Sequence, residues 1–204
     1  AVEDRLAGRA GDRWAVRDFK DACVHERSEV LTGAGEPFRV FTPYAKAWAK
    51  LPPVPPAGKL RTLRTPDAVV SEPLPTLAIW GLSPAGTVVE AGEKAARERL
   101  ARFLAGPVTR YGALRDQPGL PATSRLSQDL RYGLLSIREV FARCHEAAES
   151  QPAAARGSIQ KFIAELIWRE FYFQILWHYP DVLAHEFNPK FRGMVWPGRE
   201  ADFA

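Results

Sequence analysis

The longest run of regularly spaced apolar positions covers residues 161–179. It contains neither Gly nor Pro and is followed by Pro180, so it predicts a helix that stops there. At about 100° per residue, its far side is apolar as well, and such a helix is expected to be buried on nearly every side. One face presents the residues at the i, i+3, i+4, i+7 spacing, namely Phe162, Glu165, Trp168, Arg169, Tyr172 and Leu176.

Two charged residues lie on one stripe of this predicted helix, with an indole between them. Charges on a buried helix cost several kcal/mol each unless they are paired or used. One interpretation is an ion pair between Glu165 and Arg169 at i, i+4, with Trp168 in the core. The other is a cavity wall that offers a carboxylate, a guanidinium and an indole to a flat polar ligand. The helix alone leaves both open.

The first 51 residues combine a strand pattern with a helix pattern. Residues 36–41 alternate with a period of two after a hairpin turn at 32–35, which predicts a strand. Thr42 then offers an N-cap hydroxyl before Pro43 at the first helical position. We therefore expect the closing strand and helix of an α/β domain.

Residues 52–89 are rich in Pro and Thr and predict an extended linker. A helical period returns over residues 90–104, with Arg99 and other arginines on a solvated face. Ser136 and Glu139 form a capping box that predicts a further helix to about Ala148. We expect four apolar side chains to pin the linker to a surface at one point: Leu77, Ile79, Trp80 and Leu82.

A second concentration of polar groups lies at a predicted loop-to-helix junction, before a short helix that Gly133 terminates. A helix N-terminus attracts anions, so hydroxyls and a guanidinium there suit a phosphate. The alternative is that the hydroxyls only cap the helix, which is their commoner role. Tyr111 either adds a phenol to the same site or anchors a loop. The segment consists of Thr123, Ser124, Arg125, Leu126 and Ser127.

Composition narrows the class of protein. The chain has 204 residues, 46% of them hydrophobic, enough for one full core or for a small domain and part of another. The net charge of +4 (28 basic minus 24 acidic residues) allows an anionic partner. Cys23 and Cys144 are far apart and form no C-x-x-C, so neither a disulfide framework nor a zinc site is indicated. Without a signal peptide or a long apolar run, we expect a soluble, cytoplasmic piece of a longer protein.

Several motifs follow one another in a fixed order: Tyr111, Arg115-Asp116, Pro118, the 123–127 segment, Gly133, Ser136, Arg138 and the run from Glu165 to Tyr172. Together they resemble the DNA photolyase/cryptochrome family, most closely a class I cyclobutane pyrimidine dimer photolyase. The resemblance spans roughly residues 90–200 and extends back to residues 40–48. The resemblance implies a mainly α fragment with three parts. Residues 1–51 are the C-terminal end of a Rossmann-like α/β antenna domain, residues 52–89 are the linker between the domains, and residues 90–204 are the first part of an all-helical FAD-binding domain.

The resemblance also implies roles for individual residues. Glu165 resembles the catalytic carboxyl that hydrogen-bonds the damaged bases, and Trp168 resembles the indole against which a flipped dimer packs. Arg115, Arg169 and Tyr172 fall at DNA-facing positions. The expected FAD-binding residues are Tyr111, Thr123, Ser124, Arg125, Leu126, Ser127, Phe162 and Arg169.

The implied function is light-driven repair of pyrimidine dimers in DNA by a monomer that carries FAD. Extruding a dimer costs less than the few kcal/mol of an intact base pair, and stacking on an aromatic side chain returns about 1–3 kcal/mol per base. The alternatives are a cryptochrome without repair activity, a (6-4) photolyase, or a helical module without flavin. Residues 181–185 lack the Cys-Lys pair that holds a folate in some members, so a second antenna chromophore is of unknown type.

Overall fold

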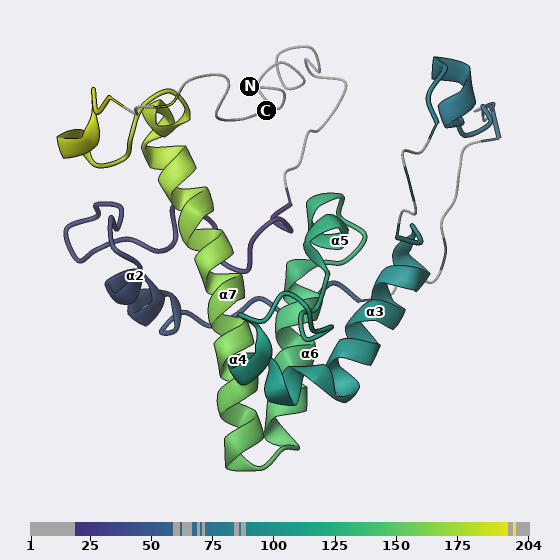
Figure 1. Ribbon diagram of the computed structural model, residues 1–204, viewed down its shortest axis with the longest axis horizontal. Coiled ribbons are helices and arrows are strands. Elements are labelled where there is room, and N and C mark those ends of the chain that lie inside the picture. The colour runs from purple at the N-terminus through teal and green to yellow at the C-terminus, as the bar shows by residue number, and fades with distance from the viewer. Residues whose placement is uncertain are drawn as a thin grey trace. The chain divides into compact units, whose positions relative to one another are not determined.

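The computed structural model describes residues 19–58, 62, 67–68, 70, 72–83, 86, 89–195 and 198 (Figure 1). Helices dominate them, as predicted, and their one β pairing is an isolated antiparallel bridge between Leu31 and Pro37. The elements are α2 (Phe41–Trp48), η2 (Leu77–Trp80), α3 (Glu93–Ala105), η3 (Pro107–Arg110), α4 (Tyr111–Leu114), α5 (Ser127–Arg131), α6 (Ile137–Glu149), α7 (Ala153–His178), η4 (Pro180–Leu183) and η5 (Pro189–Phe191).

The chain divides into two compact units. The first contains the described parts of Ala1–Val54 and Gln160–Ala204, and the second those of Pro55–Ile159. Helix α7 begins in the second unit and continues into the first. The predicted domain boundaries at residues 51 and 89 stay predictions.

Helix α7 confirms the long helix predicted from the apolar pattern. It starts eight residues earlier than predicted, at Ala153, and its last residue is His178, just before Tyr179 and Pro180. The expectation that nearly every side is buried is wrong for its C-terminal part. In the first unit, α2 and the segment before it cover one side of the helix, while four large side chains on other sides are exposed: Tyr172, Phe173, Leu176 and Trp177.

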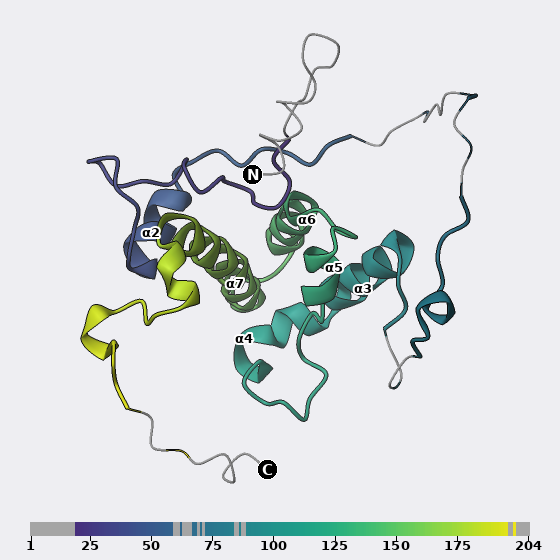
Figure 2. The ribbon, with the colours of Figure 1, turned by 90° about the horizontal axis from the view of Figure 1, so that it is seen from above.

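Helix α2 lies alongside the C-terminal part of α7 in both views (Figures 1 and 2). A buried carboxylate connects them: Glu170 of α7 accepts hydrogen bonds from the backbone N–H of Val24, from that of His25 (3.2 Å) and from Nε1 of Trp48 (2.6 Å). One turn on, the buried amide of Gln174 donates to the carbonyl of Phe38 (2.7 Å). These contacts tie α2 and the preceding segment to α7.

The start of α2 differs from the prediction. The turn at residues 32–35 is a hairpin turn, closed by Gly35 N–H to Thr32 O (2.9 Å), but the pairing ends at the Leu31–Pro37 bridge. The strand expected over residues 36–41 is therefore wrong. Helix α2 begins at Phe41 with Val40 as its N-cap, so Thr42 is a helical residue and not the cap. From Phe41 onward, the backbone groups form the hydrogen bonds of helix α2 in place of strand pairing.

In the second unit, α3 packs against α6, and the Ser136 hydroxyl caps α6 by accepting from the Arg138 N–H (3.3 Å). The predicted N-cap at Ser136 is confirmed, whereas the return hydrogen bond from Glu139 that would complete a capping box stays a prediction. The expectation that the arginines of α3 lie on a solvated face is wrong for Arg99, because its guanidinium forms an ion pair with the buried carboxylate of Asp129. The expected pinning of the linker is wrong as well: η2 leaves Leu77, Ile79, Trp80 and the following Leu82 between 48% and 65% exposed.

Candidate functional site

The acid and the indole singled out from the sequence lie one turn apart on α7, and both are half-buried. Trp168 belongs to a cluster of four aromatic rings. Its indole stacks on Phe41, with ring centroids 3.6 Å apart and planes 6° apart. Phe171 meets it edge-on at 5.6 Å, and Tyr172 stacks at 5.6 Å with planes 26° apart. Trp168 is therefore a fixed wall beside Glu165, rather than a fully buried core residue.

Arg169 turns back toward the N-terminal segment. Its Nη1 donates to the carbonyl of Ala22 (2.7 Å), and its guanidinium carbon lies 4.4 Å from the ring centroid of Phe173. Burial lowers the pKa of Arg169, and the nearby Glu170 carboxyl opposes that shift. The guanidinium is thus tied to the segment before α2. Both interpretations of the stripe that holds Glu165, Trp168 and Arg169 stay predictions.

The other two site residues predicted on α7 have opposite environments. Tyr172 is 60% exposed, so its ring is open to a ligand, whereas Phe162 is buried at 5% exposure. Phe162 is therefore part of the packed interior, and little of its ring is exposed to a ligand. Their predicted roles in DNA and flavin binding stay predictions.

The 123–127 segment lines a hollow of about 410 Å³ in the second unit, together with Val89 and Gln128. Helix α5 begins at Ser127, its N-cap is Leu126, and no side chain caps it. The alternative that these hydroxyls cap the helix is therefore wrong. Thr123 and Ser124 make no hydrogen bond to the residues that the structure describes, so their hydroxyls are available to a ligand in the hollow.

Arg125 gives this segment an unusual backbone. Its φ of +50° lies in the left-handed region, which costs a residue with a side chain about 1–2 kcal/mol. The Gln128 amide offsets that cost by donating to the Arg125 carbonyl (2.6 Å) and to the buried Asp129 (3.1 Å). Because α5 has only five residues, its dipole adds little attraction for an anion. The donors that remain are the hydroxyls and the exposed Arg125 guanidinium.

Tyr111 and Arg115 lie at the two ends of α4. The Tyr111 ring is buried and meets Phe103 edge-on at 6.0 Å. The Arg115 guanidinium lies 5.7 Å from the Tyr111 ring centroid and pairs with Asp116 at 3.4 Å. Tyr111 is not among the residues that line the hollow at 123–128.

The hydroxyl of Ser158, which was not singled out from the sequence, holds the backbone around Tyr111 in the second unit. Ser158 Oγ donates to the carbonyl of Val108 (2.8 Å) and accepts from the N–H of Gly112 (2.8 Å). It thereby fixes the backbone on both sides of Tyr111. Its position in the first turns of α7 gave no indication of this, because the two partners come from a segment nearly fifty residues earlier in the chain.

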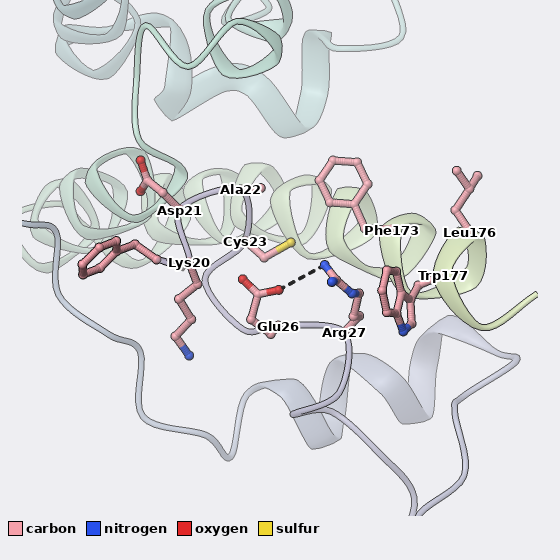
Figure 3. Close-up of a pocket in the computed structure, with 10 residues that line it drawn as sticks. Lys20, Asp21, Ala22, Cys23, Glu26, Arg27, Phe173, Leu176 and Trp177 are labelled. Atoms are coloured by element: carbon pink, nitrogen blue, oxygen red, sulfur yellow. Dashed lines mark ion pairs between the residues drawn. The ribbon is translucent and has the colours of Figure 1, made fainter. Parts of the chain in front are cut away.

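A second hollow, of about 750 Å³, lies in the first unit between residues 19–27 and the last turns of α7 (Figure 3). The guanidinium of Arg27 covers the Trp177 ring at 3.5 Å and pairs with Glu26 at 3.5 Å. Phe173 and Leu176 complete the wall on the α7 side. Residues 19–27 have no helical or strand period, so the sequence did not predict this hollow.

Both cysteines are buried thiols. Burial raises the pKa of Cys23 and of Cys144 to about 12, which keeps each protonated and unreactive at neutral pH. Within the described ranges, no group of three or more His, Cys, Asp or Glu side chains could hold a metal ion. No helix in the same ranges is long and apolar enough to cross a membrane.

Comparison with known proteins supplies the family. No family model matches the chain. It is 38% identical over 162 residues to an uncharacterized 31.6 kDa protein of Synechococcus, covering 77% of this chain. It is 33% identical over 188 residues to the deoxyribodipyrimidine photo-lyase of Halobacterium salinarum, covering 89% of this chain. A bacterial class III photolyase from Agrobacterium tumefaciens superposes with a TM-score of 0.83 over 99% of this chain, at 29% identity. The chain belongs to the DNA photolyase family.

This photolyase-family chain covers only part of its relatives. It spans 57% of the Synechococcus protein, 39% of the Halobacterium enzyme and 42% of the Agrobacterium structure. The resemblance predicted from the motifs is thus confirmed at the level of the family. The assignment to class I stays a prediction, since the structural relative is a class III enzyme.

Proposed function

We propose that the protein carrying this chain repairs cyclobutane pyrimidine dimers in DNA, using blue light and bound FAD. The observation that carries the proposal is the pairing of Glu165 with Trp168 on α7, in a chain of the photolyase family whose relatives include deoxyribodipyrimidine photo-lyases. A carboxyl and an aromatic wall one turn apart match what an extruded dimer needs: an acceptor or donor for its base edges and a flat surface for its rings.

The residues of the second unit fit the phosphates of a dinucleotide. Thr123 and Ser124 have hydroxyls without partners among the described residues, and they line a hollow with the exposed Arg125. In the proposal, Tyr111, Leu126 and Ser127 complete the FAD-binding set of this unit, and Phe162 and Arg169 keep the FAD-binding roles predicted for them in the first unit. When bound, FAD supplies the electron that opens the dimer, and the chain supplies position and exclusion of water. The antenna chromophore is not assigned.

On the substrate side, each proposed role follows from exposure and charge. Trp168 gives one face to the dimer, and Glu165 hydrogen-bonds its bases from the adjacent turn of α7. Arg115 is half-buried yet reaches the surface, and Tyr172 is exposed, so both suit contacts to the DNA backbone. Arg169 contributes charge close to the same helix face.

Repair assays on two lesions test this function. The protein, as it occurs in its organism, is purified, its absorption spectrum is recorded, and it is illuminated with blue light on DNA that holds either cyclobutane dimers or (6-4) products. We expect bands of a bound flavin and light-dependent loss of cyclobutane dimers alone. A colourless protein, a flavoprotein without repair, or repair of (6-4) products alone would each contradict the proposal.

A further inference from the structure

Phe41, the first residue of α2, covers one face of the Trp168 indole. The two rings are almost parallel, at 6°, and their centroids are 3.6 Å apart. Aromatic pairs in proteins more often meet edge-on or offset, with centroids about 4.5–7 Å apart. So close a face-to-face contact leaves no room for a base on that side of the indole. A ligand must approach Trp168 from another side.

The pair is supported from behind by the buried ring of Phe171. This ring stands nearly perpendicular to both partners, at 82° to Phe41 (5.9 Å) and 87° to Trp168 (5.6 Å). Phe171 also meets the buried Tyr44 of α2 at 5.3 Å. The Trp168 side chain is thereby held between α2 and α7, and rotation of its indole toward α2 is blocked.

We infer that Phe41 is a positioning residue for lesion binding: by covering one face of the Trp168 indole, it fixes this side chain in one rotamer. The inference rests on the proposed function. A half-buried indole that must be ordered when the ligand binds loses rotamer freedom at that moment, whereas an indole already held in place does not. Phe41 belongs to the N-terminal segment predicted as antenna domain, so that segment contributes to the lesion site without touching the lesion.

Binding measurements on matched variants test this inference. The dissociation constants of the protein, as it occurs in its organism, are measured for an oligonucleotide with a single cyclobutane dimer and for the undamaged oligonucleotide. We expect Phe41→Leu to weaken dimer binding by about threefold to tenfold, the size of one aromatic pair, and to leave undamaged DNA unaffected. Phe41→Tyr keeps the ring and should restore dimer binding. Phe38→Leu removes a ring that meets Tyr44 at 6.1 Å, and should leave both constants unchanged.

A double-mutant cycle separates positioning from general stability. In a Trp168→Leu background, Phe41→Leu should have no further effect on dimer binding, because the group that it positions is gone. Unchanged dimer binding in Phe41→Leu, or an equal loss for damaged and undamaged DNA, would overturn the inference. If Phe41→Leu does not fold, Phe41→Met takes its place with the same expectations. A wild-type protein with no preference for the dimer would instead overturn the proposed function.

Discussion

His25 is a buried titratable residue of the first unit with one ring nitrogen lacking a hydrogen-bond partner among the described residues. It is 3% exposed, its ring meets Trp48 edge-on at 4.6 Å, and the nitrogen concerned is Nε2. Burial lowers the pKa of His25 below its ordinary value of about 6.5; Lys20 adds to the shift and Glu29 opposes it. The folded state therefore disfavours the protonated ring, whereas in the unfolded state the ring binds a proton with its ordinary pKa of about 6.5.

This residue makes stability depend on pH. Because the pKa is lower in the folded state, the contribution of neutral His25 is complete above pH 6.5 and is lost as the pH falls toward the folded-state pKa. We expect the free energy of unfolding, measured by urea titration, to decrease between pH 7 and pH 5. His25→Phe should flatten that decrease. The exposed His185→Gln is the control, and an equal slope in wild type and His25→Phe would refute the assignment.

At the scale of elements, Glu170 joins α7 to α2 and to the segment before it. Burial raises the pKa of Glu170, and its three N–H donors oppose that shift by favouring the ionised carboxylate. An acid next to Arg169 in a helix is easily taken as an exposed charge, and nothing in the sequence indicates that its partners lie far away at Val24, His25 and Trp48. The contact depends on the packing of two distant segments.

Removing this carboxylate should loosen the first unit. Glu170→Ala leaves three buried N–H donors without an acceptor, each costing about 1–3 kcal/mol, so we expect the free energy of unfolding to fall by about 3 kcal/mol or more. Glu146→Ala removes an exposed carboxylate of α6 and should change it by less than about 0.5 kcal/mol. Urea unfolding monitored by circular dichroism compares the two. Equal stability of both variants would show that the hydrogen bonds of Glu170 contribute little.

The helices were predictable because their signals are local in the sequence: a period of apolar positions, a capping residue such as Ser136, and a terminating residue such as Pro180. Two errors came from the same cause: Phe41 and Arg99 were placed by local pattern, but each side chain has its partner on a remote element, Trp168 and Asp129. The site residues Glu165 and Trp168 were identified from spacing and resemblance. The stacking of Phe41 on Trp168 could not be, because it forms only once α2 lies against α7.

At the scale of the whole molecule, the affinity for DNA should depend on salt concentration, because basic side chains contact the phosphates. The chain carries a net charge of +4, and Arg115 is its proposed phosphate contact in the second unit. Each neutralised phosphate adds about 0.9 to the slope of log affinity against log salt concentration. We expect Arg115→Ala to reduce that slope by about this amount, measured by titrating DNA at several salt concentrations.

The control for this experiment is another arginine of the second unit. Arg97→Ala removes the same charge at a residue that is not a proposed DNA contact; its guanidinium lies 3.1 Å from Glu93 and 3.6 Å from Glu139. It should leave the slope nearly unchanged. If both variants reduce the slope equally, net charge rather than a specific contact governs the affinity.

The repair rate of a Glu165→Ala, Trp168→Ala double variant tests the central claim most directly. Losing the stacking surface alone costs about 1–3 kcal/mol per base, so repair of dimer-containing DNA under blue light, at DNA concentrations below saturation, should fall by about tenfold or more. The absorption spectrum and thermal stability of the variant should match those of the wild type. Repair at the wild-type rate by the folded, flavin-bearing variant would contradict the account.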